Sequence, residues 1–210
     1  MEFVEKDKKK LILVAGARPN FMKIAPLMHA LKNHASIKPI LVHTGQHYDV
    51  QMSGQFFEEL NIPSPDINLE VGSASHAVQV ARIMEGFEKV CLDIQPDFVL
   101  VVGDVNSTAA CTLVASKLNI KTIHYEAGLR SNDRSMPEEI NRLVTDAICD
   151  VFFTTSKDAD DNLLKEGVAK EKIFMVGNLM IDSLATNLAR SSKSKTSFKL
   201  VNKDKEVTLG

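Results

Sequence analysis

Residues 97–108 read DFVLVVGDVNST, and this stretch decides the fold class. Its first half is apolar and mostly β-branched, without the alternation of a half-exposed strand, which is typical of a strand buried on both faces. A glycine and small polar residues then replace the apolar run. Residues 106–118, NSTAACTLVASKL, continue as a helix-like segment. The stretch therefore predicts one strand–turn–helix unit.

The same unit recurs along the chain. The other apolar runs are LILVAG (11–16), PILVHTG (39–45), KTIHYEA (121–127), DVFFTTS (150–156) and KIFMVGN (172–178). Helix-like stretches separate them, at residues 19–34, 75–94, 137–150 and 156–167. Strands that alternate with helices indicate a parallel, doubly wound, Rossmann-like α/β sheet.

Three details refine the predicted helices. Pro19 suits the first turn of the helix after the first strand. Ser156 is a candidate N-cap for a helix that ends at Gly167. In residues 137–150 the apolar side chains fall on one stripe, the spacing of a helix packed on a core; they are Ile140, Leu143, Val144, Ala147 and Ile148.

The composition is that of an ordinary globular domain. The 210 residues are 44% hydrophobic and 25% charged, with a formal net charge of −2. This charge gives no electrostatic case for nucleic acid or a membrane surface, and no apolar run is long enough to span a bilayer. The run LILVAGA is short and leads into Arg18-Pro19 without a cleavage site, so we interpret it as a strand and not as a signal peptide. The isolated cysteines, Cys91, Cys111 and Cys149, indicate reduced core thiols in a cytosolic protein.

The last residues differ from the rest. Residues 189–210 are rich in Ser and Lys and lack helical periodicity, and their end, EVTLG, resembles a strand. One interpretation is a frayed terminus. The other, which we favour, is a domain over residues 1–188 followed by a linker and the start of a second domain.

Polar residues gather where the predicted strands end. Ligands of an open parallel sheet bind at the carboxyl ends of its strands. In GARPN, Arg18 lies beside a helix N-terminus, a combination that favours a phosphate, although an arginine at such a turn is often only a surface cation; Lys23 lies about one helical turn further on. In GDVNST, Asp104 or Asn106 can either cap the next helix or face a ligand.

The segment EAGLRSNDRSMPEEINR (126–142) carries charge of both signs. Glu126 should sit at a strand tip, where it needs a cation partner, and Arg130 is the candidate. Glu138 falls in the first turn of a helix, where carboxylates complement the helix dipole, and an exposed pair between Glu138 and Arg142 is the ordinary interpretation of their spacing. Asp104, Glu126 and Glu138 then meet at one edge, where carboxylates can transfer protons or stabilise an oxocarbenium-like sugar.

The histidines and the metal-binding motifs give little further evidence about the site. His124 is expected to pack in the core, and His47 is the histidine best placed for a ligand. The sequence has no HExxH, DxDxDG or Cys/His pairing, so we expect no metal and no other cofactor.

These residues resemble those of the UDP-N-acetylglucosamine 2-epimerase family, particularly its non-hydrolysing members. The similar segments, in family order between about residues 11 and 184, are GARPNFMKIAPL, TGQHYD, VVGDVNSTAA, HYEAGLRSNDRSMPEEINRLVTD, FFTTS and VGNLMIDSL. The resemblance implies the first of two Rossmann-like domains in a glycosyltransferase-B-like arrangement. The second domain would supply a catalytic-site histidine and the uridine diphosphate site, so we expect this chain to be inactive alone. Homodimers in the cytoplasm, serving cell-surface polysaccharide synthesis, are also implied.

The implied reaction interconverts UDP-GlcNAc and UDP-ManNAc. UDP leaves C1 as the C2 proton is removed, and re-addition delivers a proton to the other face of C2. By motif position Asp104, Glu126 and Glu138 are the catalytic carboxylates, and Arg18, Lys23 and Arg130 contact the nucleotide sugar. An activating second UDP-GlcNAc would lie near Gln46, His47 and Arg82.

Three alternatives stay open at this point. The protein could be a hydrolysing epimerase that releases free ManNAc, although GDVNST and MPEEINR favour the non-hydrolysing branch. It could be a glycosyltransferase of similar architecture, which would need an acceptor site. The chain alone could also be an inert folding or oligomerisation domain.

Overall fold

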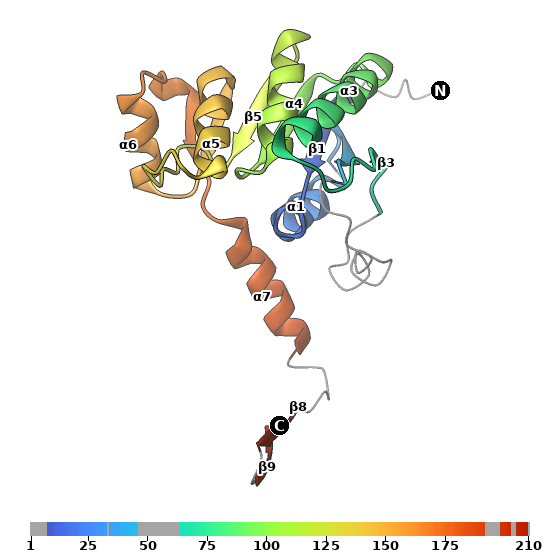
Figure 1. Cartoon of the computed structure of the whole chain (residues 1–210), viewed down its shortest axis with the longest axis vertical. Coiled ribbons are helices and arrows are strands. Elements are labelled where there is room, and N and C mark those ends of the chain that lie inside the picture. Colours follow the sequence, from blue (N-terminus) through green and yellow to red (C-terminus); the bar gives the residue numbers. More distant parts are fainter. Residues whose placement is uncertain (1–7, 33, 46–63, 192–197, 203–204, 210) are drawn as a thin grey trace.

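The computed structural model describes residues 8–32, 34–45, 64–191, 198–202 and 205–209. Within them, seven parallel strands form one sheet in the order β3-β2-β1-β4-β5-β6-β7 (Figure 1). The strands are β1 Lys9–Ala15, β2 Ile37–His43, β3 Ile67–Asn68, β4 Phe98–Val102, β5 Lys121–Tyr125, β6 Val151–Thr154 and β7 Ile173–Met175. All six predicted strands are present, and the two-residue β3 is additional. The doubly wound α/β class is confirmed.

The strand order creates a switch point at the centre of the sheet. The chain builds outward from β1 to β3, returns, and then builds in the opposite direction from β4 to β7. The helices are α1 Arg18–Leu31, α3 His76–Ile94, α4 Asn106–Lys117, α5 Pro137–Ile148, α6 Lys157–Lys165 and α7 Leu179–Ser191, with a short 3-10 helix η1 at Lys170–Lys172. The connections after β1 and β4 run in opposite directions there, and in open parallel sheets ligands bind at the carboxyl ends of such a pair of strands.

Strand β1 shows why the apolar runs are continuous. Leu11 and Leu13 pack with α1 in one cluster of buried residues. The intervening Ile12 and Val14 pack with α3 and α4 in a second cluster. Because successive side chains point to opposite faces, a strand covered on both sides must be apolar at every position.

Helix α5 is oriented differently from our prediction. Ile140 and Val144, which we expected in the core, are 39% and 40% exposed. The buried side chains of this helix are Glu139, Thr145 and Asp146. The periodicity predicted a helix correctly but not its inward face, because α5 turns its polar face toward the carboxyl edge of the sheet.

The predicted cap of α6 and the predicted burial of the cysteines are confirmed. The Ser156 hydroxyl accepts a hydrogen bond from the Ala159 N–H at 3.4 Å and caps α6, and Gly167 follows that helix with a φ of +90°. Cys91, Cys111 and Cys149 are buried, free thiols. In the described residues, no helix is long and apolar enough to cross a membrane.

The C-terminal part extends away from the sheet (Figure 1). Helix α7 continues to Ser191, beyond the domain boundary expected at residue 188. Strands β8 Phe198–Asn202 and β9 Lys205–Leu209 then pair as an antiparallel hairpin, and β9 contains most of the predicted EVTLG strand. The proposed boundary therefore falls within a helix.

Candidate active site

The turns after β1 and β4 interlock at the switch point. A Cβ on Gly16 would collide with the Ser107 side chain, so the two turns approach as closely as glycine permits. The Asn20 side chain ties them together: its Oδ1 accepts hydrogen bonds from the N–H groups of Gly16 (3.0 Å) and Ala17 (2.9 Å), and its Nδ2 donates to the Val102 carbonyl at 3.1 Å. The start of α1 is thereby fixed against the end of β4.

Glu126 pairs with Lys23 across the switch point. The Lys23 Nζ lies 2.5 Å from Glu126 Oε2, and the two side chains are only 16% and 12% exposed. Our prediction that Arg130 would be the partner of Glu126 is wrong, because strand order places α1 beside the end of β5. Glu126 also has a φ of +69°, a strained conformation for a residue with a side chain.

Gly103 lies beside the Glu126–Lys23 pair. A Cβ on Gly103 would lie 3.4 Å from Glu126 Oε2 and 3.7 Å from Lys23 Nζ. Asp104 is the next residue, so two of the three predicted carboxylates lie on neighbouring turns, although the Asp104 carboxylate itself pairs with Arg142. The third, Glu138, is the second residue of α5; it is half-buried and has no ion pair within the described ranges.

Arg142 links Asp104 to Glu139. Its Nη2 pairs with Asp104 Oδ2, and its Nη1 lies 2.8 Å from Glu139 Oε2. We expected Arg142 to pair with Glu138 on the helix surface, and this is wrong: the guanidinium reaches back over the edge of the sheet.

Glu139 is a buried, well-bonded carboxylate. It is 2% exposed and accepts hydrogen bonds from the Ser131 and Asn132 N–H groups, both at 3.0 Å. Burial raises the pKa of Glu139, but the Ser131 N–H, Arg142 and the Asn132 N–H outweigh it and bring the pKa from 4.5 to about 2.

Neither Asp104 nor Asn106 caps α4. The N-cap position is Val105, without a side-chain hydrogen bond. The Asn106 Nδ2 donates to Gln79 Oε1 at 2.7 Å, and Asn141 donates to the Asp104 carbonyl at 2.9 Å. The polar side chains of GDVNST thus bind neighbouring elements, and the capping alternative is excluded.

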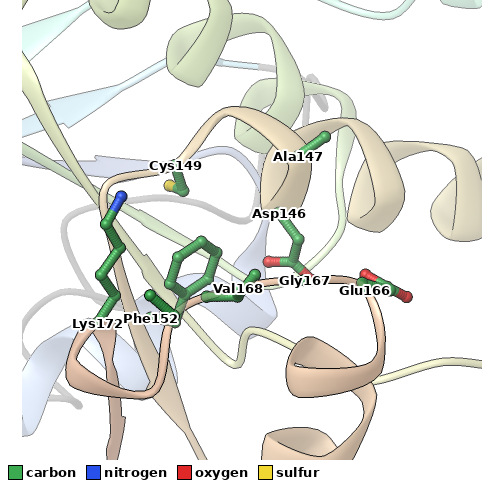
Figure 2. A pocket seen from close by; sticks show the side chains of 9 residues that line it. Asp146, Ala147, Cys149, Phe152, Glu166, Gly167, Val168 and Lys172 are labelled. Carbon is green, nitrogen blue, oxygen red and sulfur yellow. The ribbon is translucent and has the colours of Figure 1, made fainter.

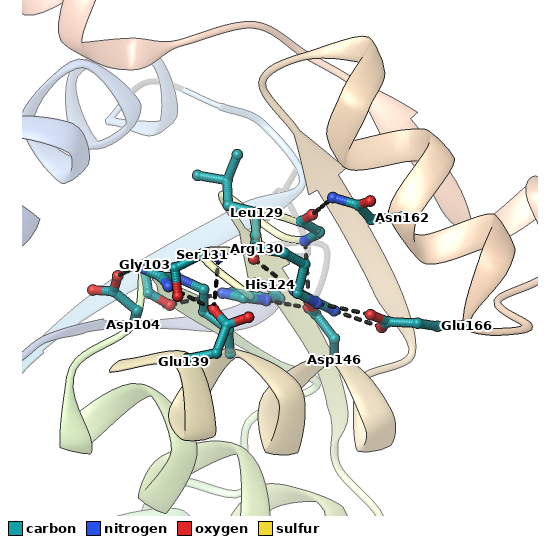
Figure 3. Close-up of polar contacts among 12 residues, drawn as sticks. Gly103, Asp104, His124, Leu129, Arg130, Ser131, Glu139, Asp146, Asn162 and Glu166 are labelled. Atoms are coloured by element: carbon teal, nitrogen blue, oxygen red, sulfur yellow. Dashed lines mark hydrogen bonds and ion pairs between the residues drawn. The ribbon is translucent and has the colours of Figure 1, made fainter. Parts of the chain in front are cut away.

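Next to Asp104 lies an ionic cluster of His124, Arg130, Asp146 and Glu166, of which only Glu166 is exposed (Figure 3). The His124 Nδ1 lies 2.6 Å from Asp146 Oδ1, and its Nε2 lies 2.8 Å from the Gly103 carbonyl. Our expectation that His124 is a core residue is confirmed, although it is hydrogen-bonded on both sides.

Arg130 belongs to this ionic cluster. Its side chain is 4% exposed, and it pairs with Asp146 at 2.8 Å and with Glu166 at 2.6 Å. It also donates to the Leu129 carbonyl at 2.7 Å. This geometry favours a structural role over the substrate contact predicted for Arg130.

The remaining predicted residues lie further out. Arg18 is the first residue of α1 and is exposed at the carboxyl edge. Arg82 is exposed on α3. Gln46 and His47 lie outside the described residues. Among the residues that are described, no group of three or more His, Cys, Asp or Glu side chains is arranged to hold a metal ion.

Sequence reasoning missed the residues that hold the carboxylates, namely Asn20, His124, Asn141, Arg142 and Asp146. The signal that could have found two of them is the polar face of α5, since Arg142 and Asp146 follow Glu139 at helical spacing. We interpreted Arg142 as the partner of Glu138 in an exposed surface pair.

A separate cavity of about 350 Å³ lies between the end of α5 and the segment after α6 (Figure 2). Cys149, Phe152 and Val168 line its middle. Asp146 and Glu166 lie at one end, and Lys172 at the other (Figure 2). None of the predicted site residues lines it, so we place the candidate active site at the sheet edge.

Comparison with known proteins gives a consistent result. The family model described as UDP-N-acetylglucosamine 2-epimerase matches residues 29–209. A UDP-N-acetylglucosamine 2-epimerase homolog from Methanococcus maripaludis is 48% identical over 193 residues, which cover 92% of this chain and 53% of that protein. A UDP-2,3-diacetamido-2,3-dideoxy-D-glucuronate 2-epimerase from Pseudomonas aeruginosa is 44% identical, with 83% of this chain and 50% of that protein covered.

A solved structure is also similar. The crystal structure of the Methanocaldococcus jannaschii UDP-GlcNAc 2-epimerase, in complex with UDP-GlcNAc and UDP, is 46% identical and superposes with a TM-score of 0.85. The match covers 89% of this chain and 51% of that one. The chain thus spans about half the length of the relatives that it matches.

Proposed function

Because this chain belongs to the UDP-N-acetylglucosamine 2-epimerase family, we propose that it forms one wall of an active site that interconverts UDP-GlcNAc and UDP-ManNAc. The observation that carries the proposal is the pairing of two carboxylates on neighbouring turns with cations, Glu126 with Lys23 and Asp104 with Arg142. The opposite wall, with the uridine diphosphate site, would come from a second domain that follows α7.

The chemistry requires both signs of charge. The C2 proton of the sugar is not acidic, so cleavage of the C1–O bond must run ahead of proton removal. The bonding electrons leave with UDP, and loss of the C2 proton forms the C1=C2 bond of 2-acetamidoglucal. Cations are needed where the diphosphate departs, and carboxylates are needed near the oxocarbenium-like carbon.

The residues of this edge match those needs. Arg18 and Lys23 lie in the first turns of α1, where backbone N–H groups also favour a phosphate. A diphosphate there would compete with Glu126 for Lys23. Asp104, Glu126 and Glu138 are the candidates to take the C2 proton and to return one to the other face, with the elimination reversed.

A homodimer, a cytoplasmic location and a second nucleotide-sugar site at Gln46, His47 and Arg82 remain proposals. The hydrolysing alternative finds no support in the relatives named above. The Pseudomonas relative carries out a 2-epimerisation on another UDP-linked acetamido sugar. The reaction class therefore extends across these relatives, while the sugar differs.

The test is product analysis with the full-length protein that contains this chain. Incubation with UDP-GlcNAc in D₂O should give both UDP-sugars, each with deuterium at C2, as followed by proton NMR. Net free ManNAc would indicate the hydrolysing reaction. Turnover without deuterium at C2, or turnover only of UDP-2,3-diacetamido-2,3-dideoxy-D-glucuronate, would contradict the proposal.

A further inference from the structure

The ionic cluster of His124, Arg130, Asp146 and Glu166 joins the two turns that carry Asp104 and Glu126. His124 lies on β5 and reaches the carbonyl of Gly103, the residue before Asp104, at 2.8 Å. Asp146 lies on α5 and accepts the Gly128 N–H at 3.0 Å, two residues after Glu126. The buried His124–Asp146 pair is therefore hydrogen-bonded to both turns.

The hydrogen-bond partners define the protonation of His124. The Gly103 carbonyl can only accept, so Nε2 must carry a hydrogen. Asp146 is ionised, because the Arg130 guanidinium lies 2.8 Å from its Oδ2 and the Gly128 N–H donates to the same oxygen at 3.0 Å. Its carboxylate also accepts, so Nδ1 must carry a hydrogen too. The ring is then an imidazolium.

The charges of the ionic cluster balance. Two cations, His124 and Arg130, face two carboxylates, Asp146 and Glu166. The side chains of His124, Arg130 and Asp146 are all less than one-tenth exposed, and buried charges persist only when they are paired and hydrogen-bonded. A neutral ring would leave either the Gly103 carbonyl or Asp146 facing a nitrogen lone pair.

We propose that His124 is a positioning residue for the carboxylates: its doubly protonated ring fixes the turns that carry Asp104 and Glu126. The function of this device rests on the proposed epimerase reaction. Glu126 is held at a φ of +69°, with its N–H bonded to the Phe153 carbonyl at 3.0 Å. A strained residue keeps such a conformation only when its surroundings determine it, and the Asp146–Gly128 contact supplies part of that constraint.

The first test is spectroscopic and needs no activity. In the full-length protein near neutral pH, long-range proton–nitrogen NMR of ¹³C,¹⁵N-labelled protein reports both ring nitrogens of His124, assigned through scalar couplings that connect its backbone to its ring. We expect two protonated nitrogens. One unprotonated nitrogen would overturn the inference.

The second test uses turnover. His124→Asn can still donate to Asp146 but not to Gly103, and His124→Gln can reach Gly103 but not Asp146. Each should lower kcat by roughly 100-fold, the scale of a small misplacement of catalytic groups, while KM and the Kd for UDP-GlcNAc change less than about threefold. His34→Gln, an exposed histidine beyond the end of α1, is the matched control and should be unchanged.

The two tests separate the possible failures. A rise in KM with unchanged kcat, or no change at all in either variant, would overturn the positioning role. If the parent protein does not epimerise UDP-GlcNAc, the proposed function fails, and the NMR result alone decides the state of His124. The NMR result also decides if both variants fail to fold.

Discussion

Glu139 offers a test of how the site is held together. Its carboxylate is 2% exposed and accepts hydrogen bonds from Arg142 at 2.8 Å and from the Ser131 and Asn132 N–H groups at 3.0 Å. Its pKa in the folded chain is about 2, against an ordinary value of 4.5. A tenfold change in an ionisation constant corresponds to about 1.4 kcal/mol, so the difference corresponds to about 3 kcal/mol.

Solvent reduces that value, because Asp104, which shares Arg142, is about one-third exposed. We therefore expect Glu139→Gln to lower the free energy of unfolding by about 1 to 3 kcal/mol at neutral pH. The pKa is lowered on folding, so this stabilisation is complete above pH 4.5 and is lost as the pH falls toward 2. The difference between wild type and variant should shrink over that window.

The assay is urea unfolding of the chain, followed by circular dichroism at a series of pH values. Glu138→Gln is the matched control, since it changes the adjacent carboxylate in the same helical turn, which has no ion pair in the described structure. That control should lie within about 0.5 kcal/mol of wild type. A Glu139→Gln loss no larger than the control's, or a difference that stays constant from pH 6 to pH 3, would refute the reasoning.

Three further predictions concern burial. Burial lowers the pKa of His43 from 6.5 to about 4. The wild type should therefore lose up to about 3 kcal/mol of its free energy of unfolding as the pH falls from 6.5 to 4. His43→Phe should lose less over the same range, as measured by urea unfolding at each pH. Gly16→Ala should lower the free energy of unfolding by about 2 kcal/mol, because the new Cβ would collide with Ser107. Gly86→Ala, whose Cβ would lie 3.4 Å from Leu69, should be neutral or slightly stabilising. Equal stabilities of the two variants in thermal unfolding would contradict this. Burial raises the pKa of Cys149 to about 12, so DTNB should label this thiol roughly tenfold or more slowly in the native chain than in urea, and equal rates would contradict its burial.

The sequence was sufficient to predict the sheet. Continuous apolar runs such as the one in β4 indicate a strand that is buried on both faces. This inference does not depend on which elements pack against the strand. The short strand β3 was not predicted, because a strand of two residues is too short to show a periodic pattern of apolar residues. The positions of Asp104 and Glu126 followed from the rule that ligands bind at the carboxyl ends of parallel strands.

The partners of the carboxylates could not be predicted in the same way. We paired Glu126 with Arg130 because they are close in sequence, whereas Lys23 is its neighbour only once β4 lies between β1 and β5. Arg142 was assigned to Glu138 by helical spacing, but it turns toward Asp104. Tertiary contacts of this kind depend on strand order and on which face of α5 points inward. Local sequence patterns determine neither of them.

The most direct measurement of the central claim is turnover of UDP-GlcNAc by full-length Asp104→Asn and Glu126→Gln variants, beside the exposed controls Asp158→Asn and Glu88→Gln. We expect the two site variants to lose about 100- to 10,000-fold in kcat and to retain binding by calorimetry, while both controls stay near wild type. Site variants that turn over within about tenfold of wild type would contradict the assignment of these carboxylates to the reaction.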